Sequence, residues 1–230
     1  MNPVPVVAHH AWRIRQRAEP LRIAVTGGIA EGKTTVLRLF ESLGGRTISS
    51  DTIVATLLRP GTDLWHRLIK EFGESITTET GELNRARLAA LAFGETRLRR
   101  RLNQLLHPAA VEVIWQLVEE LSLTAARADA AGEGMGSEAL PPPIFIEVPL
   151  LIEACLQDGF DRIIVVQATP ALQRQRLLQR GVPPTLARQM LRAQLPTRAK
   201  IPFADWVIRT HRSLALVEQQ ARRIWHAIHQ

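Results

Sequence analysis

The sequence predicts an α/β protein with a five-stranded parallel sheet. Residues 144–148 and 162–166 are almost entirely apolar, as expected of strands that are covered on both faces. Apolar strands alternate with helical patterns along the chain, which favours parallel pairing with right-handed crossovers. A glycine-rich loop joins the first predicted strand to the first predicted helix. With 230 residues, the chain suits one such domain with insertions.

Residues 1–20 show no clear period, and we interpret them as a loosely held extension before the first strand. Arginines at positions 13, 15 and 17 interrupt any secretory apolar stretch, and no apolar run reaches transmembrane length. We therefore expect a cytoplasmic protein that does not associate with a membrane.

The first strand covers residues 23–25, and the loop after it, from Gly27 to Thr34, fits the phosphate-binding pattern G-x-x-x-x-G-K-[ST] at every fixed position. Its glycines allow backbone N–H groups to point at phosphate oxygens, and the helix that follows directs its positive end there. We expect Lys33 to contact the β- and γ-phosphates of ATP and the Thr34 hydroxyl to bind Mg²⁺. A glycine-rich turn with a surface lysine is the alternative. The expected ATP-binding residues are Gly28, Ile29, Ala30, Glu31, Gly32, Lys33, Thr34 and Thr35.

A second short strand, residues 47–50, ends at Asp51, and residues 51–128 then follow mostly helical patterns. Asn84 can cap a helix in which apolar residues such as Leu88 and Leu91 recur at helical spacing. Another helix is expected over residues 109–123. We assign a helical insert to about residues 57–128.

Residues 124–143 are rich in Ala, Gly, Glu and Pro, so we interpret them as a flexible insertion. The strands at 144–148 and 162–166 follow, and a weaker fifth strand is expected at 205–208. The helices between the last two strands are broken by prolines, which is consistent with a short mobile lid over about residues 176–200.

The composition, 46% apolar and 22% charged, is that of a globular protein. The formal net charge is +7, and arginine carries the excess because Lys33, Lys70 and Lys200 are the only lysines. An anionic substrate, a nucleic acid or simply arginine-favouring codons would each produce this balance. The single cysteine, Cys155, excludes a disulfide framework and a cysteine zinc site, and we expect it to be a small core residue.

Ligands of parallel α/β sheets bind at the carboxyl ends of strands, where Asp51 and Glu147 are predicted to lie. Beside a phosphate loop, Asp51 can orient or deprotonate an acceptor hydroxyl, and its alternative role is to cap the helix that begins at Thr52. Arg176 and Arg180 are four residues apart and share a helix face, where they can stabilise the charge of a transferring phosphoryl group. A solvated basic helix face is the alternative.

From about residue 21 onwards, the chain resembles the dephospho-CoA kinase family. Residues 26–35 are similar to that family's extended loop T-G-G-I-G-S-G-K-[ST]-T, and residues 147–153 to its D-V-P-L-L-F-E segment. Residues 51–61 resemble D-x-I-A-…-P-G, residues 83–93 resemble L-[DN]-R-x-x-L-…-F, and residues 106–108 its helix-opening L-H-P. Gln173, Arg176, Arg180 and Gln194 fall on its Q-x-x-R-x-x-x-R and A-Q positions.

The resemblance implies a P-loop kinase domain over residues 21–230, with a helical acceptor-binding insert and a short lid. It implies transfer of the γ-phosphoryl group of ATP to the ribose 3′-hydroxyl of dephospho-CoA, which gives CoA and ADP, with Mg²⁺ as cofactor. The catalytic candidates are Lys33, Asp51, Arg176 and Arg180, and the acceptor-binding candidates are Asp51, Arg85 and His107. For His107, a purely structural place at a helix entry before Pro108 is the alternative.

The chain departs from the family pattern at several positions. Ser49 and Glu147 stand where the family usually has aspartate, and Thr210 stands in place of a late asparagine. Ala30 and Glu31 replace the glycine and serine of the loop. The negative charge of Glu31 is compatible with bound phosphates only if its side chain points outward.

Two other functions fit the residues less well. One is a different small-molecule or nucleoside monophosphate kinase, which predicts turnover with another acceptor. The other is a nucleic-acid-binding ATPase, which predicts salt-sensitive binding of DNA or RNA. Basic residues do not interleave with aromatic ones and tyrosine is absent, which disfavours nucleic acid as a partner. The sequence predicts no oligomeric state.

Overall fold

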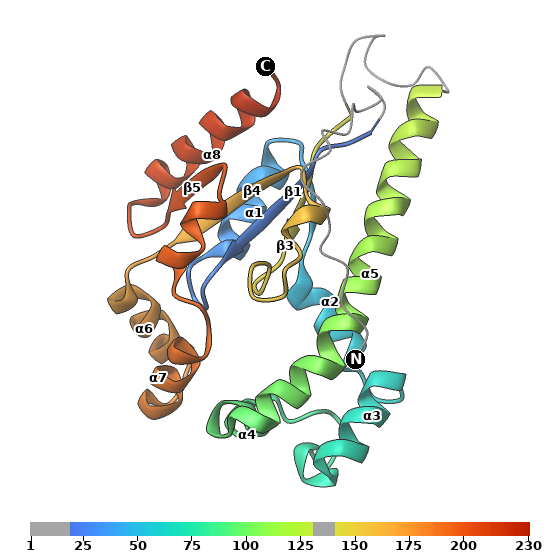
Figure 1. Ribbon diagram of the computed structural model, residues 1–230, viewed down its shortest axis with the longest axis vertical. Coiled ribbons are helices and arrows are strands. Elements are labelled where there is room, and N and C mark those ends of the chain that lie inside the picture. The colour runs from blue at the N-terminus through green and yellow to red at the C-terminus, as the bar shows by residue number, and fades with distance from the viewer. Residues whose placement is uncertain (1–18, 131–140) are drawn as a thin grey trace, which may run out of the picture.

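A five-stranded parallel sheet in the order β2-β3-β1-β4-β5 forms the centre of the molecule, which confirms the predicted fold class (Figure 1). The computed structural model describes residues 19–130 and 141–230, apart from the side chains of Arg85 and residues 125–130. The strands are β1 (Arg22–Gly27), β2 (Arg46–Ile48), β3 (Ile144–Glu147), β4 (Arg162–Gln167) and β5 (Trp206–Arg209).

Helices cover both faces of this sheet and form two further groups below it in the view of Figure 1. The helices are α1 (Lys33–Ser42), α2 (Ser50–Leu57), α3 (Asp63–Phe72), α4 (Arg85–Gly94), α5 (Thr96–Ala130), α6 (Pro170–Gln179), α7 (Pro184–Ala193) and α8 (Leu214–Ile228). The short 3₁₀ helices are η1 (Glu74–Ile76), η2 (Gln157–Gly159), η3 (Thr197–Ala199) and η4 (Ile201–Phe203).

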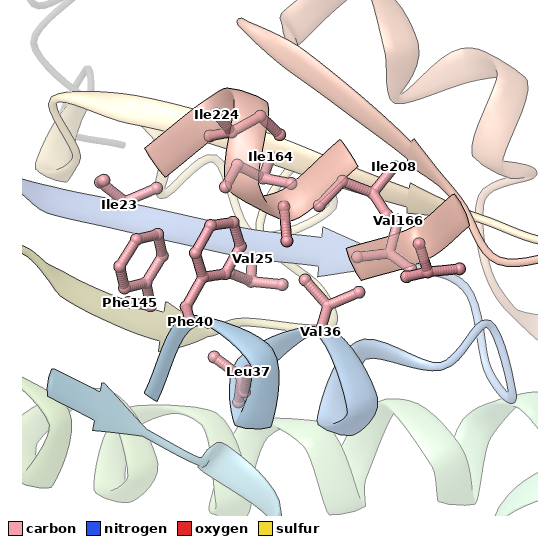
Figure 2. Packing of buried hydrophobic residues seen from close by; sticks show 12 residues of the cluster. Ile23, Val25, Val36, Leu37, Phe40, Phe145, Ile164, Val166, Ile208 and Ile224 are labelled. Carbon is pink, nitrogen blue, oxygen red and sulfur yellow. The ribbon is translucent and has the colours of Figure 1, made fainter. Parts of the chain in front are cut away.

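One face of the sheet packs against α1 and α8 (Figure 2). Phe40 of α1 stacks on Phe145 of β3 with ring centroids 4.0 Å apart, and both side chains are fully buried. Alternate residues of β1 and β4 point to this face, as the period of a strand requires. They meet apolar residues spaced three and four apart along the two helices. This packing holds α1, and therefore the loop before it, against the end of β1.

The opposite face packs mainly against α5, through residues such as Ile114 and Val118. The first half of α5 belongs to a different core, in which Leu102 and Leu105 pack against α3, η1 and α4. Pro108 lies inside α5 between these two halves. The helical insert thus has its own apolar core and shares one long helix with the sheet.

Four local predictions are wrong. Residues 106–108 do not open a helix, because α5 runs without interruption from Thr96 to Ala130 and Pro108 lies inside it. Residues 124–130, assigned to the flexible insertion, continue the same helix. Residues 131–140 lie outside the described residues. Cys155 is exposed, not in the core, and lies in a turn with a positive φ of 53°.

The fourth wrong prediction concerns Asp51. We expected it to end β2 or to cap a helix that begins at Thr52. The strand ends at Ile48 and α2 begins at Ser50, so Asp51 lies in the first turn of α2 and Ser49 occupies the N-cap position.

Candidate active site at the end of the sheet

The glycine-rich loop connects β1 to α1 at the carboxyl ends of the strands, where the sheet class binds its ligands. Gly27 has a φ of 150°, and a side chain there would collide with the carbonyl oxygen of Val166. Gly32 has a φ of 90° at the N-terminus of α1. Both positions therefore require glycine. Ala30 also has a positive φ, 56°, which is unusual for a residue with a side chain.

Lys33 is the first residue of α1, and its side chain is almost completely buried. Its Nζ donates a hydrogen bond to the carbonyl oxygen of Gly28 at 3.0 Å and lies 4.0 Å from Oε1 of Glu147. Burial lowers the pKa of Lys33, and the nearby carboxylates of Glu147 and Asp51 oppose this effect. The next two residues, Thr34 and Thr35, are exposed. The lysine is thus folded back across the loop, and Thr34 is open to solvent beside it.

Two carboxylates lie close to the Lys33 ammonium. Glu147, at the end of β3, is 1% exposed, and its Oε2 accepts a hydrogen bond from the Ser49 hydroxyl at 3.1 Å. Burial raises the pKa of Glu147, and the negative charge of Asp51 raises it further, while Lys33 and Ser49 act in the opposite direction. Asp51 is exposed to solvent. The site therefore contains one buried and one open carboxylate beside a buried ammonium group.

The segment from α6 to η3, residues 170–199, begins a few residues before the predicted lid and is called the lid from here on. It is bonded directly to the backbone of the loop. Gln173 of α6 donates to the carbonyl oxygen of Ile29 at 2.8 Å, and Gln194, just after α7, accepts from the Ile29 N–H at 2.9 Å. Arg176 donates to the carbonyl oxygen of Ala30 and, on its other side, to the backbone oxygen of Thr210, both at 3.0 Å. The loop is held on one side by side chains far away in the sequence.

The two predicted arginines have different surroundings. Arg176 is half-buried, and its Nη1 would lie 3.4 Å from a side-chain carbon at Gly32, so it sits against the loop itself. Burial, together with the neighbouring charge of Arg180, lowers its pKa. Arg180 is exposed at the C-terminal end of α6. The structure brings Arg176, more than Arg180, to the place where phosphates would bind.

Glu31 is buried and reaches the base of the lid, while its charge still acts on Lys33. Its Oε1 accepts a hydrogen bond from the Thr197 hydroxyl of η3, and its Oε2 accepts one from the Gly28 N–H, both at 2.6 Å. The nearby backbone N–H of Ala168 also favours the charged form of the carboxyl. Burial raises the pKa of the Glu31 carboxyl, and these hydrogen bonds oppose the rise. The outward side chain that the sequence required is not observed, because Glu31 is 1% exposed and its charge is met by buried hydrogen-bond donors.

A cleft of about 240 Å³ opens between the helical insert and the lid. It is mostly apolar, and its polar wall includes Arg99, Asn103 and Gln194. Gln194 also accepts from the Ile29 N–H, so one wall of the cleft is bonded to the phosphate loop. The residues that line it are Leu88, Ala89, Ala92, Phe93, Arg99, Leu102, Asn103, Leu150, Ala193 and Gln194.

Of the two acceptor-binding candidates from the insert, only His107 has a described side chain. His107 is half-buried on α5 and does not line the cleft; burial lowers its pKa, and the carboxylate of Glu153 opposes this. Arg85 is the first residue of α4, but its side chain lies outside the described part of the structure. Glu153 also bonds Lys200, which is fully buried and donates to the Pro149 carbonyl oxygen at 2.9 Å.

Sequence reasoning missed several residues of this site. The sequence predicts Glu147 at a strand end but gives it no catalytic or binding role. Thr210 was noted only as a departure, yet its hydroxyl donates to the Glu31 carbonyl oxygen at 2.5 Å. Gln173 and Gln194 matched family positions without a role, and nothing in the local sequence pointed to Thr197. These residues contact the loop from more than 140 positions away in the sequence, and such distant contacts produce no local sequence pattern.

Among the residues that the structure describes, no group of three or more His, Cys, Asp or Glu side chains is arranged to hold a metal ion. None of the helices described combines the length and apolarity needed to cross a membrane.

Comparison with known proteins gives a consistent result. A family model described as dephospho-CoA kinase matches residues 21–215. Dephospho-CoA kinase of Carboxydothermus hydrogenoformans is 34% identical over 199 residues, 86% of this chain and 89% of that protein. Dephospho-CoA kinase of Geobacter metallireducens is also 34% identical, over 89% of this chain and 95% of its own length.

Solved structures show the same fold. A crystal structure of a Thermus thermophilus protein superposes with a TM-score of 0.69 at 26% identity, and covers 92% of this chain and 99% of that one. Dephospho-CoA kinase from Campylobacter jejuni superposes with a TM-score of 0.56 at 22% identity over 90% of this chain and 97% of its own.

Proposed function

Because the chain belongs to the dephospho-CoA kinase family, we propose that it transfers the γ-phosphoryl group of ATP to the ribose 3′-hydroxyl of dephospho-CoA, which gives CoA and ADP. The observation that carries this proposal is the family match, which extends over residues 21–215 and so includes the phosphate loop, the helical insert and the lid. The alignments span at least 86% of the chain in the two relatives described above.

The phosphates of ATP are assigned to the backbone N–H groups from Ala30 to Thr35 and to the ammonium of Lys33. The N–H groups of Gly28 and Ile29 already have side-chain acceptors in Glu31 and Gln194. Lys33 would move from the Gly28 carbonyl oxygen to the phosphates, a short displacement for a flexible side chain. Arg176 lies against the loop and would stabilise the charge that spreads over the transferring group.

Asp51 is assigned to the acceptor hydroxyl. Asp51 is exposed at the start of α2, and its charge acts on both Lys33 and Glu147. A hydroxyl bound to Asp51 therefore lies near the phosphate loop. An ionised carboxylate at this place can orient the hydroxyl and accept its proton as the phosphoryl group transfers. Glu147 is buried and hydrogen-bonded to Ser49, which suits it to balancing the charge of Lys33.

The oxygen groups present fit Mg²⁺. The Thr34 hydroxyl is open to solvent beside the loop, and the neighbouring carboxylates are hard oxygen ligands. In such sites the ion takes most of its ligands from phosphates and water, so a dedicated protein cluster is not required. Bound there, Mg²⁺ would neutralise charge on the β- and γ-phosphates.

The acceptor body is assigned to the cleft between the insert and the lid. Apolar residues of α4 and α5 line the cleft, Gln194 links its wall to the loop, and Arg99 provides a cation. Arg85 and His107 stay predictions as acceptor-binding residues, and so does the cytoplasmic location.

A coupled assay for ADP release tests the proposal. Wild-type protein should turn over ATP with dephospho-CoA and show little turnover with nucleosides, nucleoside monophosphates or single-stranded DNA. Mass spectrometry should identify CoA as the product. Lys33→Met keeps the buried alkyl chain and removes the ammonium, and should lower kcat by about 10² or more. Equal or better turnover with another acceptor would contradict the assignment.

A further inference from the structure

The base of the lid is joined to the phosphate loop by a buried pair of side chains. Glu31 is 1% exposed and Thr197 is 9% exposed, and the Thr197 hydroxyl donates to Glu31 Oε1 at 2.6 Å. The two residues are 166 positions apart. Oε2 of the same carboxylate holds the Gly28 N–H at the other side. One side chain therefore connects the start of the loop to the lid.

Each named partner of this carboxylate is a hydrogen-bond donor. Burying a carboxylate is costly unless its oxygens are bonded, and here the Thr197 hydroxyl and the Gly28 N–H provide those bonds. Loss of the Thr197 hydroxyl would leave one oxygen short of a donor in a buried place. The pair is therefore costly to separate.

A serine, the residue that the family usually has at position 31, is too short to do this. Its single oxygen cannot hold the Gly28 N–H and reach the Thr197 hydroxyl together, whereas the two oxygens of Glu31 do both. Gln194, three residues before Thr197, holds the Ile29 N–H from the same stretch of the lid. The tether of Glu31 thus adds to a contact that fixes the same part of the loop.

We propose that Glu31 is a positioning residue that ties the phosphate loop to the base of the lid through Thr197, so that both are ordered before ATP binds. The inference rests on the proposed function only in assigning phosphates to this loop. Ordering a loop in advance removes part of the entropy cost of binding, so the tether should strengthen ATP binding without taking part in the chemistry.

The first experiment measures the Kd of a non-hydrolysable ATP analogue by calorimetry, which needs no acceptor. Thr197→Val removes the hydroxyl at nearly constant volume, and Glu31→Ser removes the tether from the other side. We expect each to raise Kd about threefold to tenfold, in line with the net contribution of one hydrogen bond. Thr197→Ser keeps the hydroxyl and should bind as the wild type does. The double variant should be no weaker than the weaker single variant, because both lose the same contact.

Glu31→Gln separates the tether from the charge. Its amide oxygen can accept from Gly28 and its NH₂ group can donate to Thr197 Oγ1, so the tether survives and Kd should stay within about twofold. If Glu31→Gln weakens binding as much as Glu31→Ser, the charge matters and the proposed tether is wrong. Additive effects of the two single changes would also overturn the proposal.

Hydrogen exchange in the free protein provides a readout without nucleotide. Amides of residues 184–199 should exchange faster in Thr197→Val and Glu31→Ser than in the wild type, and equally fast in Thr197→Ser. Thermal melting checks that the variants fold. Unchanged exchange and Kd in folded Thr197→Val would refute the tether. A wild type that binds the analogue but does not phosphorylate dephospho-CoA would refute the proposed function and leave the tether standing.

Discussion

Two carboxylates, one at the end of β3 and one in the first turn of α2, act on the Lys33 ammonium, and they differ in burial. Glu147 is buried and accepts a hydrogen bond from the Ser49 hydroxyl, so its carboxylate is placed to balance the charge of Lys33. Asp51 is exposed in the first turn of α2, so a substrate can reach it. Ser49 and Glu147 both stand where the family usually has aspartate, and in this structure they are hydrogen-bonded to each other.

Asp51→Asn tests the role of the open carboxylate. The change keeps the shape of the side chain but removes the base, so kcat should fall by about 10² to 10⁴ at saturating ATP and dephospho-CoA. Asp63→Asn is the matched control, because Asp63 is also an exposed acidic residue in the first turn of a helix, α3. It loses the same small interaction with the helix dipole and should leave kcat unchanged. Near-normal kcat in Asp51→Asn would contradict the assignment.

His107 should make the stability of the protein depend on pH. Because burial lowers its pKa, the folded protein binds fewer protons at this residue than the unfolded chain does. Its contribution to stability is therefore complete at pH values above the histidine pKa of the unfolded chain, about 6.5, and is lost as the pH falls below that pKa. Chemical denaturation between pH 8 and pH 5 should show a shallower decline in His107→Gln than in the wild type. Parallel curves would show that the histidine does not titrate differently on folding.

At the scale of elements, α6 supports the loop from the side. Gln173 and Arg176 are three residues apart on the same face of the helix, and both donate to loop carbonyl groups. Thr169 caps the helix by accepting from the Leu172 N–H at 3.3 Å, which fixes where that face begins. The position of the loop thus depends on the position of α6.

Arg176→Lys should lower kcat/KM for ATP by about 10- to 100-fold, because an ammonium group cannot hold the Ala30 and Thr210 carbonyl groups and a phosphate at the same time. The control is Arg180→Lys, on the same helix but exposed, where we expect a change of less than about threefold. Steady-state kinetics with varied ATP decides between them. A larger loss in Arg180→Lys would move the phosphate-binding role to that residue.

At the scale of the whole molecule, α5 joins two cores. Its first half packs with α3 and α4, and its second half packs on the sheet. The acceptor side of the site is therefore attached to the sheet by a continuous helix, while the lid is attached through its bonds to the loop. Figure 1 shows the lid and the insert at the same end of the sheet, with the far end of α5 at the opposite end.

Residues 131–140 should be dispensable for the chemistry. In the sequence they come shortly before Ile144, where β3 begins, and the starts of strands lie at the opposite edge of the sheet from its ligands. Replacing them with a Gly-Ser sequence of equal length should leave kcat and both KM values unchanged within about twofold, since the loop closure cost hardly changes. A large increase in KM for dephospho-CoA alone would show that the segment contacts the acceptor.

The sequence predicted the elements whose signals are local. The strands β1, β3 and β4 are continuous apolar runs, and the predicted loop and the cap at Asn84 are where the pattern placed them, with Asn84 accepting from the Arg87 N–H. Local sequence signals gave wrong predictions where tertiary packing acts against them. Pro108 normally ends a helix, but α5 passes through it because apolar residues on both sides are buried in the two cores. Cys155 lies in an apolar stretch of sequence, which predicts a core position, yet it lies in an exposed turn.

By itself, the sequence determined the sheet, the phosphate loop and the identity of Lys33 and Asp51 as site candidates, because glycine geometry, strand period and helix capping act over a few residues. The tertiary structure alone decided that Arg176 lies nearer the loop than Arg180, that Glu147 and Ser49 form a bonded pair, and that Glu31 turns toward Thr197. These contacts join segments 98 to 166 residues apart. Only packing of the sheet against its helices brings such distant side chains together, and burial then requires each polar group to find a partner.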